Sequence, residues 1–160
     1  MKNVKEAAIT KLEERGVTIN DIATIVYNIQ GSYQNITVDD CKEMVLSIIS
    51  KRETLYTILT GIAIDEIAEK GLFDPEINKI ITDDNSLYGL DEILALSIVN
   101  MNGSIALTNF GYLDKTKPGI IGQLDKEGKS STKCHTFLDD IICAIAASAA
   151  SRIAHQVIKK

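Results

Sequence analysis

Acidic residues stand beside apolar segments at three places in the second half of the chain. Asp91 and Glu92 precede the apolar run ILALSIV, and Asp139 and Asp140 precede the run IICAIAASAA. Between these pairs, Asp114 lies in the segment LDKTKPG, next to two lysines. Carboxylate oxygens are the ligands that Mg²⁺, Mn²⁺ and Ca²⁺ prefer, and lysine binds phosphate as a point charge. These residues therefore predict a divalent-metal site that acts on a phosphate ester.

The simplest alternative is that each acid only caps a helix. A carboxylate at a helix N-terminus is stabilised by about 0.3–1 kcal/mol, which would explain Asp91. Asp139, three residues after Thr136, resembles part of a capping box. One cap per helix start is enough, however, and here the acids come in pairs. Adjacent helical positions point about 100° apart, so beside such apolar segments at least one acid of each pair should be partly buried and need a cation or a donor.

Basic and imidazole side chains near the acids are candidates for phosphate binding and proton transfer. We predict that Lys115 and Lys117 bind the substrate phosphate, with ordinary charges at a helix end as the alternative. They begin a basic stretch that consists of Lys115, Lys117, Lys126, Lys129 and Lys133. This stretch could be an anion-binding rim or a solvated loop. His135 is expected to be a polar residue flanking the last helix, with general acid–base chemistry as the alternative.

The elements that must position these residues all show helical spacing. Apolar residues recur at intervals of three and four, and no stretch alternates as a strand would. We therefore predict an all-α, compact multihelical single domain of about seven or eight helices over residues 1–160. The helical patterns cover residues 2–15, 18–30, 37–50, 54–70, 75–81, 87–101, 104–115 and 136–158.

Local signals sharpen this prediction at several points. Thr18 or Asn20 is placed to cap the second helix, and Thr37 to begin the third. Gly61 costs about 1 kcal/mol inside a helix relative to alanine, so it is expected to allow a neighbour to pack closely or to permit a kink. The alanines after residue 143 would let another helix approach the last helix. Residues 122–133, GQLDKEGKSSTK, are predicted to be a loop that could act as a lid.

Composition limits the partners and the compartment. The chain has 22 acidic and 17 basic residues and a net charge of −5, which argues against a nucleic-acid surface. Three cysteines without CxxC spacing argue against a disulfide framework or a zinc site. The N-terminus has no apolar signal segment, and the apolar run of 141–150 is too short to span a bilayer, which takes about 20 residues. We expect a cytoplasmic protein with no transmembrane segment, with membrane-surface contact left open.

Three segments carry a resemblance to a known family. GLDEILALSI at 89–98, LDKTKPGII at 113–121 and FLDDIICAIAAS at 137–148 resemble the W-D-E-x-x-G, L-D-x-x-K-P and D-D-x-x-A-G motifs of phosphatidylglycerophosphatase A. The resemblance is closest to the soluble, low-temperature-requirement-type branch and extends loosely over residues 55–155. Residues 1–54 lie outside the clearest resemblance and lack the P-G-T-x-G-S segment of membrane members.

The resemblance implies an enzyme, a Mg²⁺-dependent phosphatase that hydrolyses phosphatidylglycerophosphate to phosphatidylglycerol. Mn²⁺ or Ca²⁺ could substitute for Mg²⁺. Carried over by motif, the implied metal ligands are Glu92, Asp114, Asp139 and Asp140. The implied catalytic residues are Asp91, Asp139 and Lys117. The branch is expected to form a homo-oligomer, as the many apolar helix faces also suggest.

Two other functions remain open from the sequence. All-α nucleotide pyrophosphatases also gather carboxylates around Mg²⁺, typically in E-x-x-E and E-x-x-D spacing. Asp65, Glu66 and Glu69 echo that pattern only in part. A helical scaffold or regulator that keeps the fold without turnover is the second alternative, and an absence of metal binding would favour it.

Overall fold

The computed structural model describes residues 3–156, and within them the chain is helical throughout, with nine helices and no strand. The helices are α1 (Val4–Glu14), α2 (Ile19–Gln30), α3 (Val38–Ile49), α4 (Arg52–Glu69), α5 (Pro75–Thr82), α6 (Leu90–Val99), α7 (Gly103–Thr116), α8 (Ile120–Ser130) and α9 (Leu138–His155). This confirms the predicted all-α class. The predicted extension of the last helix to residue 158 lies outside the described residues.

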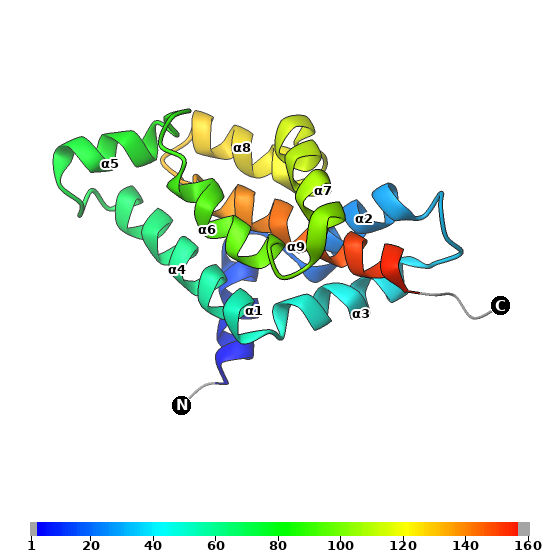
Figure 1. Ribbon diagram of the computed structural model, residues 1–160. Coiled ribbons are helices and arrows are strands. Elements are labelled where there is room, and N and C mark those ends of the chain that lie inside the picture. The colour runs from blue at the N-terminus through cyan, green and yellow to red at the C-terminus, as the bar shows by residue number, and fades with distance from the viewer. Residues whose placement is uncertain (1–2, 157–160) are drawn as a thin grey trace.

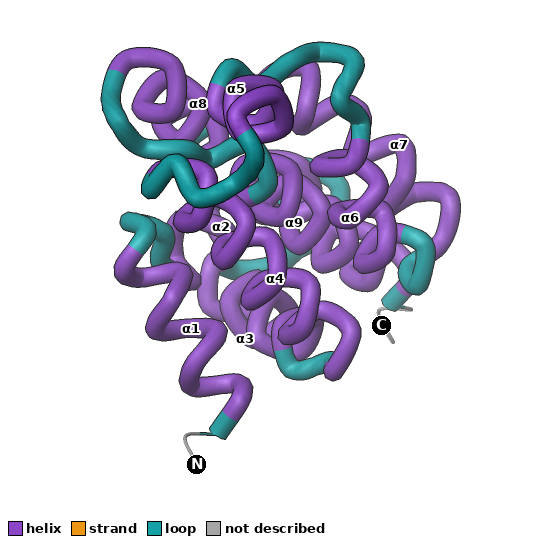
Figure 2. The backbone as a smooth tube through the Cα atoms, turned by 90° about the vertical axis from the view of Figure 1, so that its left-hand side faces the viewer, coloured by secondary structure: helices purple, strands orange, loops and turns teal. Residues whose placement is uncertain are grey.

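The helix α9 forms the centre of the molecule. Every residue from Leu138 to Ser151 is buried, and α2, α3, α4, α6, α7 and α8 all pack against this helix. Figures 1 and 2 show α9 in the middle of the other helices in two perpendicular views. The small side chains that follow residue 143 allow this many neighbours, because an alanine surface lets helices approach closely. The acidic pair at the start of α9 is thus anchored in the core.

Close packing also fixes the N-terminal end of α9 against α4. A Cβ atom added to Gly61 would collide with Ile141 Cδ1 and lie 3.3 Å from Phe137 Cβ. Any larger residue would force Ile141 to move, so Gly61 allows α4 to pack closely against the first turns of α9, which confirms one of its two expected roles. Tyr88 packs edge-on against Phe137, with ring centroids 5.9 Å apart. This contact ties the segment before α6 to the same end of α9.

The two predicted threonine caps are present. The Thr18 hydroxyl accepts the Asp21 N–H at 3.1 Å while Asp21 accepts the Thr18 N–H at 2.8 Å. Thr37 and Asp40 form the same capping box at the start of α3, with distances of 3.1 and 2.7 Å. Such caps depend only on residues three apart in sequence, so sequence patterns predict them well.

The prediction of a loop over residues 122–133 is wrong, because residues up to Ser130 form the helix α8. Ile121 and Leu124 are buried against α9, and Asp125 pairs with Lys129 one turn later at 2.8 Å. The apolar contact and the i,i+4 ion pair outweigh the glycines and the polar character of the segment. None of the described helices combines the length and the apolar character that crossing a bilayer requires.

Candidate metal and phosphate site

Three helix ends meet at one pocket. The N-termini of α6 and α9 and the C-terminus of α7 contribute the three acidic motifs, and the pocket has a volume of about 300 Å³. The loop after α5 and the polar face of α8 complete the wall. The pocket is lined by Asp84, Asn85, Ser86, Asp91, Glu92, Asp114, Lys117, Asp125, Lys129, Asp139 and Asp140. The structure therefore brings together all the sequence-predicted site residues except Lys115, which is exposed and outside this lining.

Lys117 links two of the acidic motifs. Its ammonium group lies 2.9 Å from Asp114 Oδ1 and 3.1 Å from Asp139 Oδ2. Burial opposes the charge of Lys117, but Asp139 and Asp114 outweigh burial and raise the pKa of the ammonium group. The helix α7 ends at this point. The backbone of Lys117 adopts the left-handed conformation, with φ 45° and ψ 57°, and Pro118 follows. Proline disfavours a helical conformation in the residue before it.

Backbone strain is concentrated at the pocket. Among the described residues, Asp84 and Lys117 are the two residues other than glycine with positive φ, at 48° and 45°. Each side chain lines the pocket. Sparsely populated backbone conformations cost about 1–3 kcal/mol each and cluster at functional sites. Their location is an independent indication that this pocket, rather than another cavity, is the functional site.

The pocket carries a large excess of negative charge. Seven of its lining residues are carboxylic acids, and two are lysines. Asp139 and Asp140 are 4% and 3% exposed, and no described ion pair includes Asp140. Burial, followed by the neighbouring charges of Asp139, Asp114 and Asp91, raises the pKa of Asp140. Burial, followed by the charges of Asp114 and Asp91, also raises the pKa of Glu92.

The donor set fits a hard divalent cation. Carboxylates outnumber ammonium groups, and oxygen ligands of this kind suit Mg²⁺ rather than zinc. In the positions that the side chains adopt, no three or more described His, Cys, Asp or Glu residues are arranged to hold one metal ion. The Lys117 ammonium group instead bonds Asp114 and Asp139. The chemistry of the site therefore favours a cation, and the acids would have to turn toward it.

Asp91 makes no side-chain cap hydrogen bond, whereas Asp139 Oδ1 accepts the Asp140 N–H at 2.8 Å within the first turn of α9. The N-cap of α6 is Gly89 and that of α9 is Phe137, and neither helix start has a side-chain cap hydrogen bond of its own. Thr136, the expected partner of Asp139, donates its hydroxyl to the Ile81 carbonyl at 2.6 Å. The capping box expected between Thr136 and Asp139 is therefore not formed.

A distant acid caps α9 in their place. Asp65 on α4 is fully buried, and its two carboxylate oxygens accept the N–H groups of Phe137 and Leu138, each at 3.0 Å. These amides belong to the first turn of α9, which otherwise leaves its N–H groups unpaired. Because Asp65 takes this role, the two acids that follow Leu138 in sequence remain available to the pocket.

His135 is held in a buried network away from the acidic pocket. It is 4% exposed, with Nδ1 3.2 Å from Arg15 Nη2 and Nε2 3.2 Å from Glu127 Oε2. Arginine only donates hydrogen bonds, so Nδ1 accepts and the proton lies on Nε2. Burial, and then the charge of Arg15, lower the pKa of His135. The histidine therefore links Arg15 to Glu127 in this buried network.

Sequence reasoning missed three charged residues that line the pocket, Asp84, Asp125 and Lys129, and the uncharged Asn85 and Ser86. Asp84 lies between the helical patterns of 75–81 and 87–101, and Lys129 belongs to the basic stretch. Asp125 and Lys129 had a detectable signal, since acidic and basic residues four apart favour a helix with both on one face. Asp84 had no comparable signal, because its position depends on how α5 and α6 pack.

Fold and site together define a class: an all-α protein with a carboxylate-lined pocket where three helix ends meet. The family model of phosphatidylglycerophosphatase A matches residues 12–155. The chain belongs to the phosphatidylglycerophosphatase A family, as the three motifs indicated. The family match also includes most of the N-terminal region that lay outside the clearest resemblance.

Relatives of similar length support this assignment. The uncharacterized protein YpjQ of Bacillus subtilis is 52% identical over 150 residues, which cover 92% of this chain and 83% of that protein. The solved structure of the low temperature requirement C protein from Listeria monocytogenes has a TM-score of 0.92 at 48% identity, with 96% of each chain covered. A solved structure from Bacillus stearothermophilus has a TM-score of 0.92 at 54% identity, covering 97% of this chain and 96% of that one. The low-temperature-requirement-type branch is thereby confirmed.

Proposed function

We propose that the chain is a Mg²⁺-dependent phosphatase that removes the terminal phosphate of phosphatidylglycerophosphate and leaves phosphatidylglycerol. The observation that carries the proposal is the charge of the pocket, where seven carboxylic acids face two lysines. A phosphate dianion would be repelled by such walls unless a cation accompanied it. Membership of the phosphatidylglycerophosphatase A family supports the choice of a phosphate ester and of a lipid headgroup.

The acids that would hold the metal are those that also crowd one another: Glu92, Asp114, Asp139 and Asp140. When bound, Mg²⁺ would neutralise phosphate oxygens and lower the pKa of a water molecule. Bringing a cation among these carboxylates would also offset their mutual repulsion. The same acids therefore serve both the binding of the cation and the stability of the loaded protein.

Asp91 and Lys117 have distinct roles in the proposed reaction. Asp91 is 9% exposed, lines the pocket and takes part in no ion pair among the described residues, so its carboxylate would accept a proton from the attacking water. The water oxygen bonds to phosphorus, the bond from phosphorus to the alcohol oxygen breaks, and the alcohol oxygen takes up the proton that Asp91 accepted from the water. The Lys117 ammonium group, held by Asp114 and Asp139, would stabilise the charge that develops on the phosphate oxygens.

The nucleotide pyrophosphatase alternative has less support. Asp65 caps α9, and Glu66 pairs with Lys11 at 3.0 Å. Glu69 pairs with Arg15 and accepts the Cys134 N–H. None of these three acids lines the acidic pocket. The partial match of Asp65, Glu66 and Glu69 to the E-x-x-E spacing is therefore explained by their contacts within the fold.

The test measures phosphate release from a short-chain phosphatidylglycerophosphate by the purified chain, with Mg²⁺ and with a chelator. Release that requires Mg²⁺, with little turnover of a panel of nucleoside triphosphates, is the expected result. Preferred release of pyrophosphate from nucleotides would favour the pyrophosphatase alternative. No turnover, together with no Mg²⁺ or Mn²⁺ binding in calorimetric titration, would favour the non-catalytic scaffold and overturn the proposal.

A further inference from the structure

One lysine bonds two acids of the proposed metal site. The Lys117 ammonium group lies 2.9 Å from Asp114 Oδ1 and 3.1 Å from Asp139 Oδ2. These two acids are half of the donor set that the proposed function assigns to the cation. The other half, Glu92 and Asp140, takes part in no ion pair among the described residues. The lysine therefore holds carboxylates that a metal ion would also need.

Asp139 is the more constrained of the two acids that bond Lys117. Its Oδ1 accepts the Asp140 N–H at 2.8 Å and its Oδ2 accepts the lysine, so both carboxylate oxygens are engaged. The bond from Lys117 to Asp114 uses only Oδ1. Asp114 can therefore offer its second oxygen to a cation and keep the lysine, whereas Asp139 has to release the lysine to free Oδ2.

The backbone of Lys117 is held in place, whereas its side chain can move. The Lys117 N–H donates to the Leu113 carbonyl at 2.8 Å. The Lys117 carbonyl lies against the first turn of α8, where a Cβ atom added to Gly122 would be only 2.5 Å from it. The ammonium group, in contrast, stands at the end of a flexible four-carbon stem. It can leave Asp139 while the end of α7 stays where it is.

The lysine cannot make room for a metal ion by losing its charge. Lysine is an ammonium ion at neutral pH, and two bonded carboxylates favour that charged form further. A divalent cation and an ammonium ion a few ångströms apart repel each other, and more strongly in a partly buried pocket than in water. Both cannot occupy Asp139 Oδ2 at once, so they compete for it.

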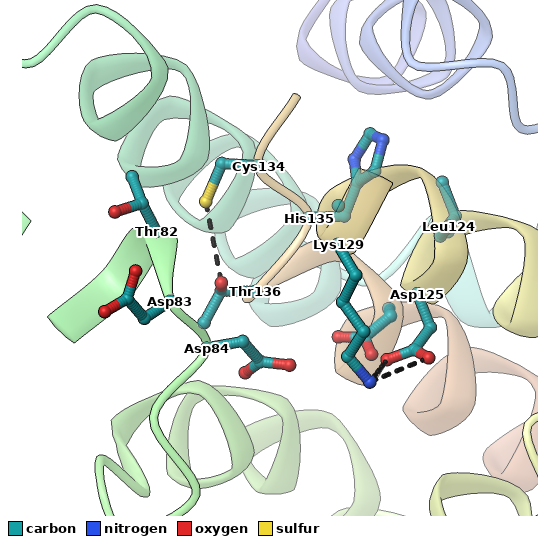
Figure 3. A pocket seen from close by; sticks show the side chains of 11 residues that line it. Thr82, Asp83, Asp84, Leu124, Asp125, Lys129, Cys134, His135 and Thr136 are labelled. Atoms are coloured by element: carbon teal, nitrogen blue, oxygen red, sulfur yellow. Dashed lines mark hydrogen bonds and ion pairs between the residues drawn. The ribbon is translucent and has the colours of Figure 1, made fainter. Parts of the chain in front are cut away.

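The other lysine of the pocket provides a contrast. Lys129 bonds both carboxylate oxygens of Asp125, at 2.8 and 3.0 Å, one turn earlier on α8 (Figure 3). Asp125 is not among the acids that the proposed function assigns to the metal. Lys129 therefore neutralises an acid of its own helix and competes with a cation for none of the four proposed ligands.

We propose that Lys117 competes with the divalent cation for Asp139, and that cation binding transfers the lysine from Asp139 toward the substrate phosphate. The inference rests on the metal site of the proposed function. Asp114 keeps its bond to the lysine, whose remaining N–H donors then become available to phosphate oxygens. Because the lysine is paired with both acids until the cation binds, cation binding precedes productive binding of the phosphate.

The first test compares the Mg²⁺ affinity of the wild type, Lys117→Met and Lys129→Met in calorimetric titration. Methionine keeps much of the length of lysine and removes the charge. Lys117→Met is expected to bind Mg²⁺ about tenfold more tightly than the wild type or better, because a charge-assisted bond no longer competes. Lys129→Met removes the same charge from the same pocket and should tighten binding no more than about threefold. Equal gains in the two variants, or no gain in Lys117→Met, would overturn the competition.

A crystal structure of the wild type with Mn²⁺ gives a second readout that needs no variant to fold. Anomalous scattering locates the metal ion, and the distance from Lys117 Nζ to Asp139 Oδ2 reports the displacement. The expected distance is well beyond the present 3.1 Å, with Lys117 still bonded to Asp114. A bound metal ion with both lysine bonds intact would contradict the proposal.

The outcomes separate this inference from the proposed function. Metal binding that behaves as expected, without phosphate release from any ester, would overturn the phosphatase and leave the competition in place. Phosphate release that requires Mg²⁺, with unchanged Mg²⁺ affinity in Lys117→Met, would do the reverse. No binding of Mg²⁺ or Mn²⁺ by the wild type would overturn both.

Discussion

Two clusters of acidic residues lie in this molecule, and their partners differ. On α4, each acid has its own donor or cation: Asp65 accepts two backbone N–H groups, Glu66 pairs with Lys11 and Glu69 pairs with Arg15. In the acidic pocket, seven carboxylic acids share two lysines. The α4 cluster is thus satisfied within the fold, whereas the pocket is not.

The difference teaches how to separate structural acids from site acids. A buried carboxylate without a partner costs folding free energy, so a fold that retains several of them retains them for another purpose. Acid pairs or E-x-x-E spacing in the sequence do not reveal this. The partners do, and in this chain most of those partners come from other helices.

The largest expected effect comes from removing one pocket acid. Asp140→Asn should lower Mg²⁺-dependent phosphate release by about 10²–10³-fold, the range that the loss of a principal electrostatic group costs. Glu66→Gln, in the α4 cluster, is the matched control and should leave turnover within about twofold. Phosphate release by both variants under identical conditions is the measurement. Equal losses in the two variants would erase the distinction between the clusters.

The reverse pattern is expected for stability. Asp65→Ala leaves the N–H groups of Phe137 and Leu138 unpaired, and each buried unpaired group costs about 1–3 kcal/mol. Urea unfolding should show this loss, and Asp65→Asn, which keeps one acceptor oxygen, should lose less. Asp140→Asn should be as stable as the wild type or more so, because it removes a buried carboxyl group that must either take up a proton on folding or carry a charge without a cation. A large destabilisation by Asp140→Asn would contradict this account of the pocket.

The raised pKa of Asp140 in the pocket should make the folded protein less stable as pH rises. The folded pKa of Asp140 is raised above the ordinary value of about 3.9, so above about pH 4 the folded state binds more protons than the unfolded state. Without metal, the free energy of unfolding should therefore fall as pH rises from about 4. The slope is about 1.4 kcal/mol per pH unit for each carboxyl that is protonated only when folded.

Burial also raises the pKa of Asp65, although its two N–H donors and Arg15 oppose the rise, so Asp65 contributes in the same direction. The difference between the wild type and Asp140→Asn isolates the contribution of the pocket. Urea midpoints at pH 5 and pH 8 measure it, and added Mg²⁺ should recover the stability lost at pH 8 in the wild type only. A wild-type midpoint that rises between these pH values would have the wrong sign.

The smallest expected effect concerns the two lysines of the K-x-K-P segment. Lys115 is exposed and outside the pocket lining, so Lys115→Ala should change kcat/KM by no more than about twofold, as a screened surface charge does. Lys117→Ala removes the cation that bonds Asp114 and Asp139 and should cost far more. A tenfold rise in KM for Lys115→Ala would show that Lys115 reaches the phosphate, as the sequence predicted.

Features that depend on residues close in sequence were predictable. Helical periodicity determined the all-α class, and the capping boxes at Thr18 and Thr37 follow from residues three apart. The close approach of another helix at Gly61 was indicated by the cost of a glycine inside a helix. The three acidic motifs indicated one site because paired acids beside apolar runs are hard to explain otherwise.

Features that depend on contacts between distant segments were not predictable. The sequence offered Asp139 as a possible cap of α9, whereas Asp65, more than seventy residues earlier, accepts the N–H groups of Phe137 and Leu138. The helix α8 was taken for a loop because its stability depends on Ile121 and Leu124 packing on α9. Asp84 joined the pocket only through the packing of α5 against its neighbours.

The sequence by itself thus determined the helices and the residue types that could bind a metal and a phosphate, because periodicity and local charge act over a few residues. Only the tertiary structure decided which acids are neutralised and which are left in excess. The electrostatic state of a carboxylate is set by every donor and cation within a few ångströms, and in a helical bundle those groups come from distant parts of the chain.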